Sequence, residues 1–84
     1  MRLSWEEGAL ADLEQAASWS ARQAKAVVDA MEWMAEGRWS LGRPTLDPDL
    51  RYWPVPPLGV IYRIAGDELI VAAVVDPRRL RRLP

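Results

Sequence analysis

The sequence predicts a small α+β domain, in which a short first strand and a helical hairpin pack on a mainly antiparallel β-sheet. Apolar residues recur at helical spacing over residues 5–37. Residues 50–75 instead contain β-branched and aromatic runs separated by turn-forming residues. A helical half followed by a strand half is typical of the α+β class. Because the chain has 84 residues, half of them hydrophobic, we expect one domain spanning residues 1–84.

A short first strand is expected in residues 1–5, and a first helix in residues 5–18. Ser4 and Glu7 have the spacing of a capping box, in which a serine side chain accepts a hydrogen bond at the start of a helix. The acidic residues here also suit the positive end of the helix dipole. The apolar stripe of this helix consists of Leu10, Leu13, Ala16 and Ala17.

A second helix is expected from Ser20 to Gly37. Ser20 and Gln23 form another capping box, which restarts the chain as a helix after a break near Trp19. Gly37 is suited to end it. Its apolar stripe consists of Ala24, Val27, Val28, Met31 and Met34. Since the link between the two helices is very short, they are expected to form an antiparallel hairpin.

Residues 37–49 show no periodicity and contain two glycines and two prolines, so they predict a loop. Residues 50–53 resemble a strand. Residues 54–57 are predicted to be a connection, because three prolines in four residues do not suit an internal strand. The element order is therefore expected to be β-α-α-β-β-β.

Residues 58–75 predict a hairpin of two long strands. The first strand is rich in β-branched and aromatic residues, namely Val60, Ile61, Tyr62 and Ile64. Residues 65–68 form the turn, where Gly66 can adopt a positive φ without steric cost. Residues 69–75 are almost continuously apolar, which is typical of a central strand covered on both faces. Pro77 cannot donate to a sheet and ends this strand.

Composition excludes several classes of site. The chain has no cysteine, which excludes disulfides, thiolate nucleophiles and zinc–cysteine clusters, and no histidine, the most common acid–base catalyst near neutral pH. No cofactor or metal is expected. No apolar run approaches the roughly 20 residues of a membrane span, and the N-terminus lacks the apolar core of a signal peptide. We therefore expect a cytoplasmic protein.

The charges are unevenly distributed along the chain. Residues 1–36 carry three basic and seven acidic residues, a net charge of −4, whereas residues 37–84 carry eight arginines and five acidic residues, a net charge of +3. Arginine suits bidentate pairing with carboxylate or phosphate, although a GC-rich genome explains its excess equally well. This charge is far below that of a dedicated nucleic-acid binder.

A family resemblance appears in the C-terminal half. The string Gly59-Val60-Ile61-Tyr62-Arg63-Ile64, a Gly-Asp turn, an apolar strand and then Arg78-Arg79 resemble the RelE/ParE toxins of bacterial type II toxin–antitoxin systems. The resemblance extends more weakly over nearly the whole chain. It implies the same β-α-α-β-β-β fold and a protein antitoxin that neutralises the toxin in a hetero-oligomer. It also implies growth inhibition and plasmid stabilization as cellular roles.

The RelE-like members of this family are ribosome-dependent mRNA endoribonucleases. The resemblance to them implies a catalytic set of Arg51, Arg63 and Arg79, with Tyr62 as a further candidate. Since side chains alternate along a strand, Tyr62 and Arg63 face opposite sides, and the residues themselves favour a core aromatic at Tyr62 and a solvated strand residue or a salt bridge to an acid at Arg63. Several residues of the nuclease pattern are missing, however. An arginine is expected near Gly59, a lysine pair on the preceding strand, and a tyrosine or histidine after the C-terminal arginine, and none of them is present. Without an acid and base in position, phosphoryl chemistry would be slow.

The ParE-like members are described as inhibitors of DNA gyrase that act by binding. The chain is expected to be of this kind, leaning against an enzyme, with a ribosome-dependent nuclease or a non-toxic interaction module as alternatives. The expected target-binding residues are Arg78, Arg79 and Arg81, although these arginines would equally serve to solvate the C-terminal tail. The expected antitoxin-binding residues are Trp33, Met34, Trp39 and Trp53, unless they close the small core against the long loop.

Overall fold

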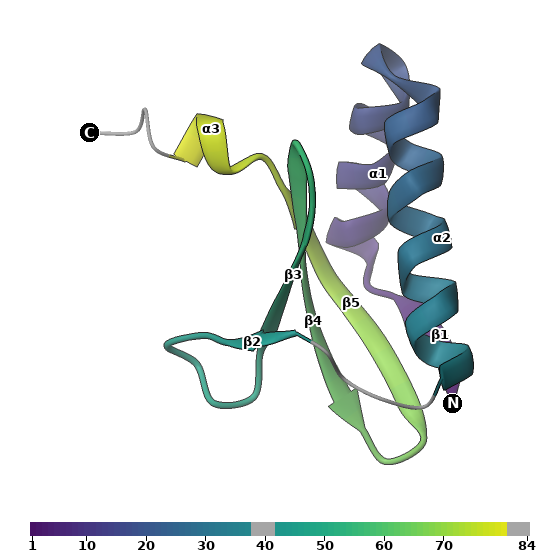
Figure 1. Ribbon diagram of the computed structural model, residues 1–84, viewed down its shortest axis with the longest axis vertical. Helices are drawn as coiled ribbons and strands as arrows, with labels where there is room; N and C mark the ends of the chain where they lie inside the picture. Colours follow the sequence, from purple (N-terminus) through teal and green to yellow (C-terminus); the bar gives the residue numbers. More distant parts are fainter. Residues whose placement is uncertain (38–41, 81–84) are drawn as a thin grey trace.

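The fold is α+β, with a helical hairpin on one face of a five-stranded sheet (Figure 1). This computed structural model describes residues 1–37 and 42–80, with the backbone alone at residues 79 and 80. Trp39 and Arg81 therefore lie outside the described residues. The elements in chain order are β1 (Arg2–Trp5), α1 (Glu7–Trp19), α2 (Ala21–Gly37), β2 (Arg43–Pro44), β3 (Arg51–Val55), β4 (Leu58–Ala65), β5 (Glu68–Val75) and α3 (Pro77–Leu80).

The strands are arranged in the order β1-β5-β4-β3-β2. β1 runs parallel to β5, with Leu3 opposite Leu69, and every other neighbouring pair is antiparallel. The hairpin of α1 and α2 packs on one face, and we call the opposite face the open face. The β2–β3 loop and α3 both project from the sheet on the side away from the hairpin (Figure 1). No helix of the described residues is long and apolar enough to cross a membrane.

The capping box predicted at Ser4 is wrong. Ser4 lies inside β1, where it pairs with Ile70, and α1 begins at Glu7 with Glu6 at the N-cap and no side-chain cap bond. Strand pairing takes precedence over capping here. The backbone amide of Glu6 still donates to the carbonyl oxygen of Val71 in β5, at 2.9 Å, so the pairing with β5 extends past Ser4. The chain therefore stays extended through the serine, which cannot act as a cap.

Only one of the two hydrogen bonds of the second capping box forms. The amide of Gln23 donates to Ser20 Oγ at 3.1 Å, and α1 ends at Trp19, one residue beyond the predicted end at residue 18. The Gln23 side chain, however, turns away from the cap. Its amide nitrogen donates to the carbonyl oxygens of Val55 and Pro56, at 3.0 and 3.1 Å. Gln23 therefore fixes the first turn of α2 beside the end of β3.

The region around β2 and β3 differs from the prediction. The expected loop contains the two-residue strand β2, and β3 continues through Pro54 to Val55. Pro54 is compatible with the strand because β2 pairs only with residues 51 and 52, so Pro54 has no described strand on that side. The turn that follows is Pro56–Pro57, which contains a cis peptide bond. The short helix α3 was not predicted.

The core lies between the hairpin and the sheet. Its fully buried large side chains are Tyr62, Met31, Met34, Leu69, Val27, Val60 and Val71. β5 contributes Leu69, Val71 and Val74 to this core, whereas the residues between them, Ile70, Ala72 and Ala73, are only half-buried. The prediction that β5 is covered on both faces is therefore wrong. One apolar face packs under the helices, and the other belongs to the open face.

Candidate functional site

Tyr62 is a structural residue of the core. Its side chain is 0% exposed, and its phenolic oxygen accepts a hydrogen bond of 2.8 Å from the amide of Gly42. The carbonyl oxygen of Gly42 accepts a longer bond, 3.3 Å, from the Arg51 guanidinium. Both polar groups of Gly42 are thus held where the chain enters β2. Because it is buried, Tyr62 cannot reach a substrate as a general acid.

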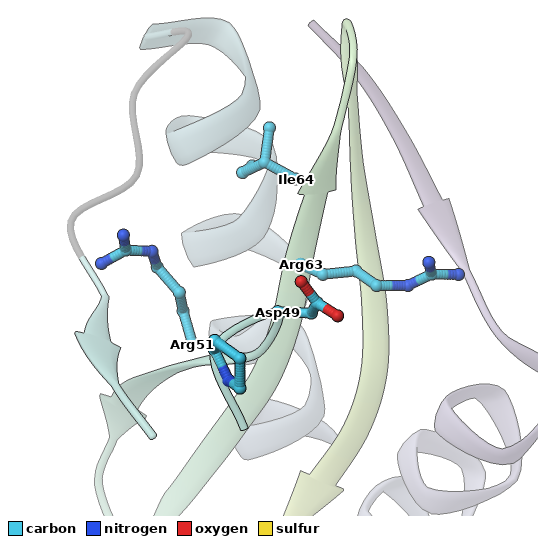
Figure 2. A pocket seen from close by; sticks show the side chains of 5 residues that line it. Asp49, Arg51, Arg63 and Ile64 are labelled. Carbon is cyan, nitrogen blue, oxygen red and sulfur yellow. The ribbon is translucent and has the colours of Figure 1, made fainter. Parts of the chain in front are cut away.

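Two of the candidate arginines line one surface hollow. This hollow of about 340 Å³ lies between the β2–β3 loop and the strands β3 and β4, and its lining residues are Pro48, Asp49, Arg51, Arg63 and Ile64. Figure 2 shows that the guanidinium groups of Arg51 and Arg63 extend in opposite directions. The strand register explains this divergence. Arg51 pairs with Tyr62, so its side chain starts on the same face of the sheet as that buried ring. Arg63 follows Tyr62 in β4, so its side chain points to the open face.

The Arg63 side chain extends from β4 across β5 toward the end of β1, the strand at one edge of the sheet. Its Nη2 atom lies 3.5 Å from Oε1 of Glu6, the residue that follows β1. Both side chains are about half exposed, so water screens this ion pair. Arg63 and Glu6 therefore form an exposed ion pair on the open face.

Gly59 and Tyr52 form a close pair on the open face. A Cβ atom built on Gly59 would overlap the Tyr52 ring and hydroxyl, so the ring lies directly on the glycine backbone. The two residues are diagonal neighbours, since Tyr52 pairs with Ile61 and Gly59 with Pro54. The position where the nuclease pattern expects an arginine is thus occupied by a glycine covered by a tyrosine.

Arg78 is held at the end of β5 by Asp76. The Asp76 carboxylate accepts a hydrogen bond from the amide of Arg78 at 2.9 Å, and two from its guanidinium, each 3.2 Å. The side-chain hydrogen bond and the negative charge of Asp76 raise the pKa of Arg78. Asp76 thus caps α3 and fixes one cation beside it. The side chains of Arg79 and Arg81 lie outside the described part of the chain.

The described residues offer binding groups rather than an acid–base pair. The hollow combines two diverging guanidiniums with the exposed Asp49, and the described residues include no group of three or more acidic side chains placed to hold a metal ion. Arg79 is not placed relative to Arg51 and Arg63. This arrangement can attract anionic or polar groups.

The residues expected to contact an antitoxin lie in different environments. Trp33 on α2 is 50% exposed, whereas Trp53 is half-buried against the core. Met34 is 0% exposed, so it packs inside the core and leaves no surface for a partner. Sequence reasoning missed Leu46, which is fully exposed on the β2–β3 loop. Its one signal in the sequence is an isolated leucine within a segment rich in glycine and proline.

Comparisons with known proteins agree with this fold. A family model described as the ParE toxin of the type II toxin–antitoxin system parDE matches residues 3–81. No curated protein matches the chain. A solved structure of the chromosomal ParDE system from P. aeruginosa is similar, with a TM-score of 0.73 and 20% identity over 90% of this chain and 95% of that one.

Two further solved structures share the fold. The YoeB/ParE toxin from Agrobacterium tumefaciens has a TM-score of 0.73 and 19% identity over 90% of this chain and 98% of its own. The conserved hypothetical protein HP0894 from Helicobacter pylori has a TM-score of 0.59 and 13% identity, over 89% and 92% of the two chains. At these identities the structural likeness establishes the fold alone.

Proposed function

Because the chain belongs to the ParE toxin family of type II toxin–antitoxin systems, we propose that it inhibits a bacterial target protein by binding it. DNA gyrase is the proposed target, and the cytoplasm the proposed location. The observation that supports binding over catalysis is the arrangement of the candidate catalytic residues. Arg51 and Arg63 extend apart, and Tyr62 is buried. Cleavage of a phosphodiester requires an acid, a base and a charge clamp that converge on one phosphate.

The proposed target-binding residues are Arg78, Arg79 and Arg81. Arg78 supports this proposal because Asp76 holds it at the end of β5 while 65% of its side chain stays exposed to a partner. Its guanidinium can still donate hydrogen bonds to a second carboxylate or to a carbonyl group, since it has five N–H donors.

An antitoxin is proposed to bind as a second protein in a hetero-oligomer, with Trp33, Trp53 and Trp39 as contacts. Trp33 offers about half of its side chain to solvent, and tryptophan is enriched among the residues that dominate binding energy at protein interfaces. Met34 is left out of this set because it is buried. A helix of the antitoxin packed against α2 is the expected mode of contact.

The first test measures DNA supercoiling by purified gyrase while this protein is titrated in. Inhibition that the antitoxin from the neighbouring gene reverses is the expected result. Ribosome-dependent mRNA cleavage that Arg79→Ala abolishes together with cell killing would overturn the proposal in favour of a nuclease. A protein inactive in both assays would instead be an interaction module without toxicity.

A further inference from the structure

The β2–β3 loop, residues 45–50, is held in one shape by its own hydrogen bonds. Thr45 Oγ1 lies 2.9 Å from the carbonyl oxygen of Asp47 and 3.1 Å from that of Leu50. The amide of Asp49 donates to Asp47 Oδ1 at 2.9 Å, and the amide of Leu50 to the carbonyl of Asp47 at 3.1 Å. These bonds use both side chains and backbone, so they constrain the path of the loop backbone from which the remaining side chains project.

Leu46 is the apolar residue that this loop presents. It is 106% exposed, whereas the other exposed large apolar residues of the described chain range from 37% to 54%. Single exposed leucines are common on protein surfaces. Leu46 differs because a hydrogen-bonded loop holds it clear of every other side chain. Docking a side chain on such a pre-ordered backbone costs less conformational entropy than docking one on a mobile loop.

The surroundings of Leu46 define the partner that fits it. Asp47 and Asp49 of the same loop are exposed, so the leucine is flanked by negative charge. Pro48 and Asp49 of the loop line the hollow together with Ile64, which is 37% exposed. The loop projects on the same side of the sheet as α3, opposite the hairpin (Figure 1). This side carries Arg78, the proposed contact with the target, whereas Trp33 belongs to the hairpin.

We propose that Leu46 is the anchor residue with which the toxin binds its target protein. The side chain enters an apolar pocket on the target, and basic residues at the rim of that pocket pair with Asp47 and Asp49. The proposal rests on the proposed function, because it takes the occupant to be the inhibited protein rather than the antitoxin or a second copy of this chain. It adds to that function a contact residue and the chemistry of the surface it meets.

The test compares Leu46→Ser with Leu10→Ser, a matched control on α1 that also replaces an exposed leucine. Each purified variant is titrated into the gyrase supercoiling assay, after thermal unfolding has shown that it is folded. We expect Leu46→Ser to raise the inhibitory concentration about 10- to 100-fold, as the loss of one buried leucine contact does. Leu10→Ser should stay within about twofold. Asp49→Lys should also weaken inhibition and reduce its salt dependence.

The outcomes separate this inference from the proposed function. If the unmodified protein inhibits gyrase and Leu46→Ser inhibits it equally well, the anchor is overturned and the function stands. An equal loss in Leu10→Ser would overturn the anchor too. If gyrase is unaffected, growth arrest in cells decides: its loss in Leu46→Ser alone supports an anchor for a different target, and its retention rejects the anchor. An unmodified protein that neither inhibits gyrase nor arrests growth removes both proposals.

Discussion

The phenolic oxygen of Tyr62 and the amide of Gly42 are joined by a hydrogen bond inside the core, 20 residues apart in the chain. A Cβ atom on Gly42 would overlap the Tyr62 ring, so glycine is required for this approach. The bond fixes the point where the chain, after leaving the hairpin, enters the sheet. It also gives Tyr62 of β4 a structural role that does not depend on catalysis.

Tyr62→Phe is expected to lower the free energy of unfolding by about 1–3 kcal/mol, because the buried amide of Gly42 would lose its partner. Urea denaturation measures the change. Tyr52→Phe is the matched control, since Tyr52 is only half-buried and donates no hydrogen bond found among the described residues. A loss in Tyr62→Phe no larger than in this control would show that the buried bond contributes nothing to stability.

Gly59→Ala is expected to destabilise the protein by about 1–3 kcal/mol, because the added methyl group displaces the Tyr52 ring. Tyr52→Ala removes the ring and should make the same glycine substitution nearly neutral. A double-mutant cycle measured by urea denaturation tests this coupling. Simple additivity of the two single changes would mean that the ring and the glycine do not constrain each other.

Asp12 on α1 binds the sheet where β1 has ended. Its Oδ2 atom accepts a hydrogen bond of 3.0 Å from the backbone amide of Val74. The pairing of β5 with β1 ends before this point, at Val71. Asp12→Ala should cost about 1.5–3 kcal/mol of unfolding free energy, as expected for a bond to a charged acceptor. Asp12→Asn keeps an acceptor and should cost less.

Amide hydrogen exchange at Val74 gives the site-specific readout for this contact. Exchange should be accelerated in Asp12→Ala and remain close to the unmodified rate in Asp12→Asn. Equal exchange in all three proteins would mean that the edge of β5 is protected by packing rather than by the carboxylate.

The fold class and the hairpin could be predicted from the sequence because local patterns and tertiary contacts agree there. Ser20 caps α2 since the chain is free to turn at that point, whereas Ser4 fails as a cap because β5 holds it in a strand. Pro54 was misassigned for a similar reason. Whether a proline suits a strand depends on whether a neighbouring strand needs its amide, and local sequence does not contain that information.

The candidate site could be predicted less well. The register that turns Arg51 and Arg63 to different faces depends on strand pairing. A core position for Tyr62 could be predicted from strand alternation, but its hydrogen bond to Gly42, in a segment without periodicity, could not. Leu46 could not be recognised because exposure is a property of the folded loop. Composition alone gives the residue types available for a site, but convergence of those residues requires the fold.

Trp33 and Met34 are adjacent in the chain, and their exposures of 50% and 0% predict opposite effects when each is replaced by alanine. Met34→Ala should lower the free energy of unfolding by about 2–5 kcal/mol, because it leaves a cavity in the core. Trp33→Ala should change stability far less but weaken antitoxin binding at least about tenfold, as loss of an interface tryptophan does. Denaturation and isothermal titration with the antitoxin measure the two effects. Unchanged antitoxin affinity in a folded Trp33→Ala protein would exclude this part of α2 from the interface.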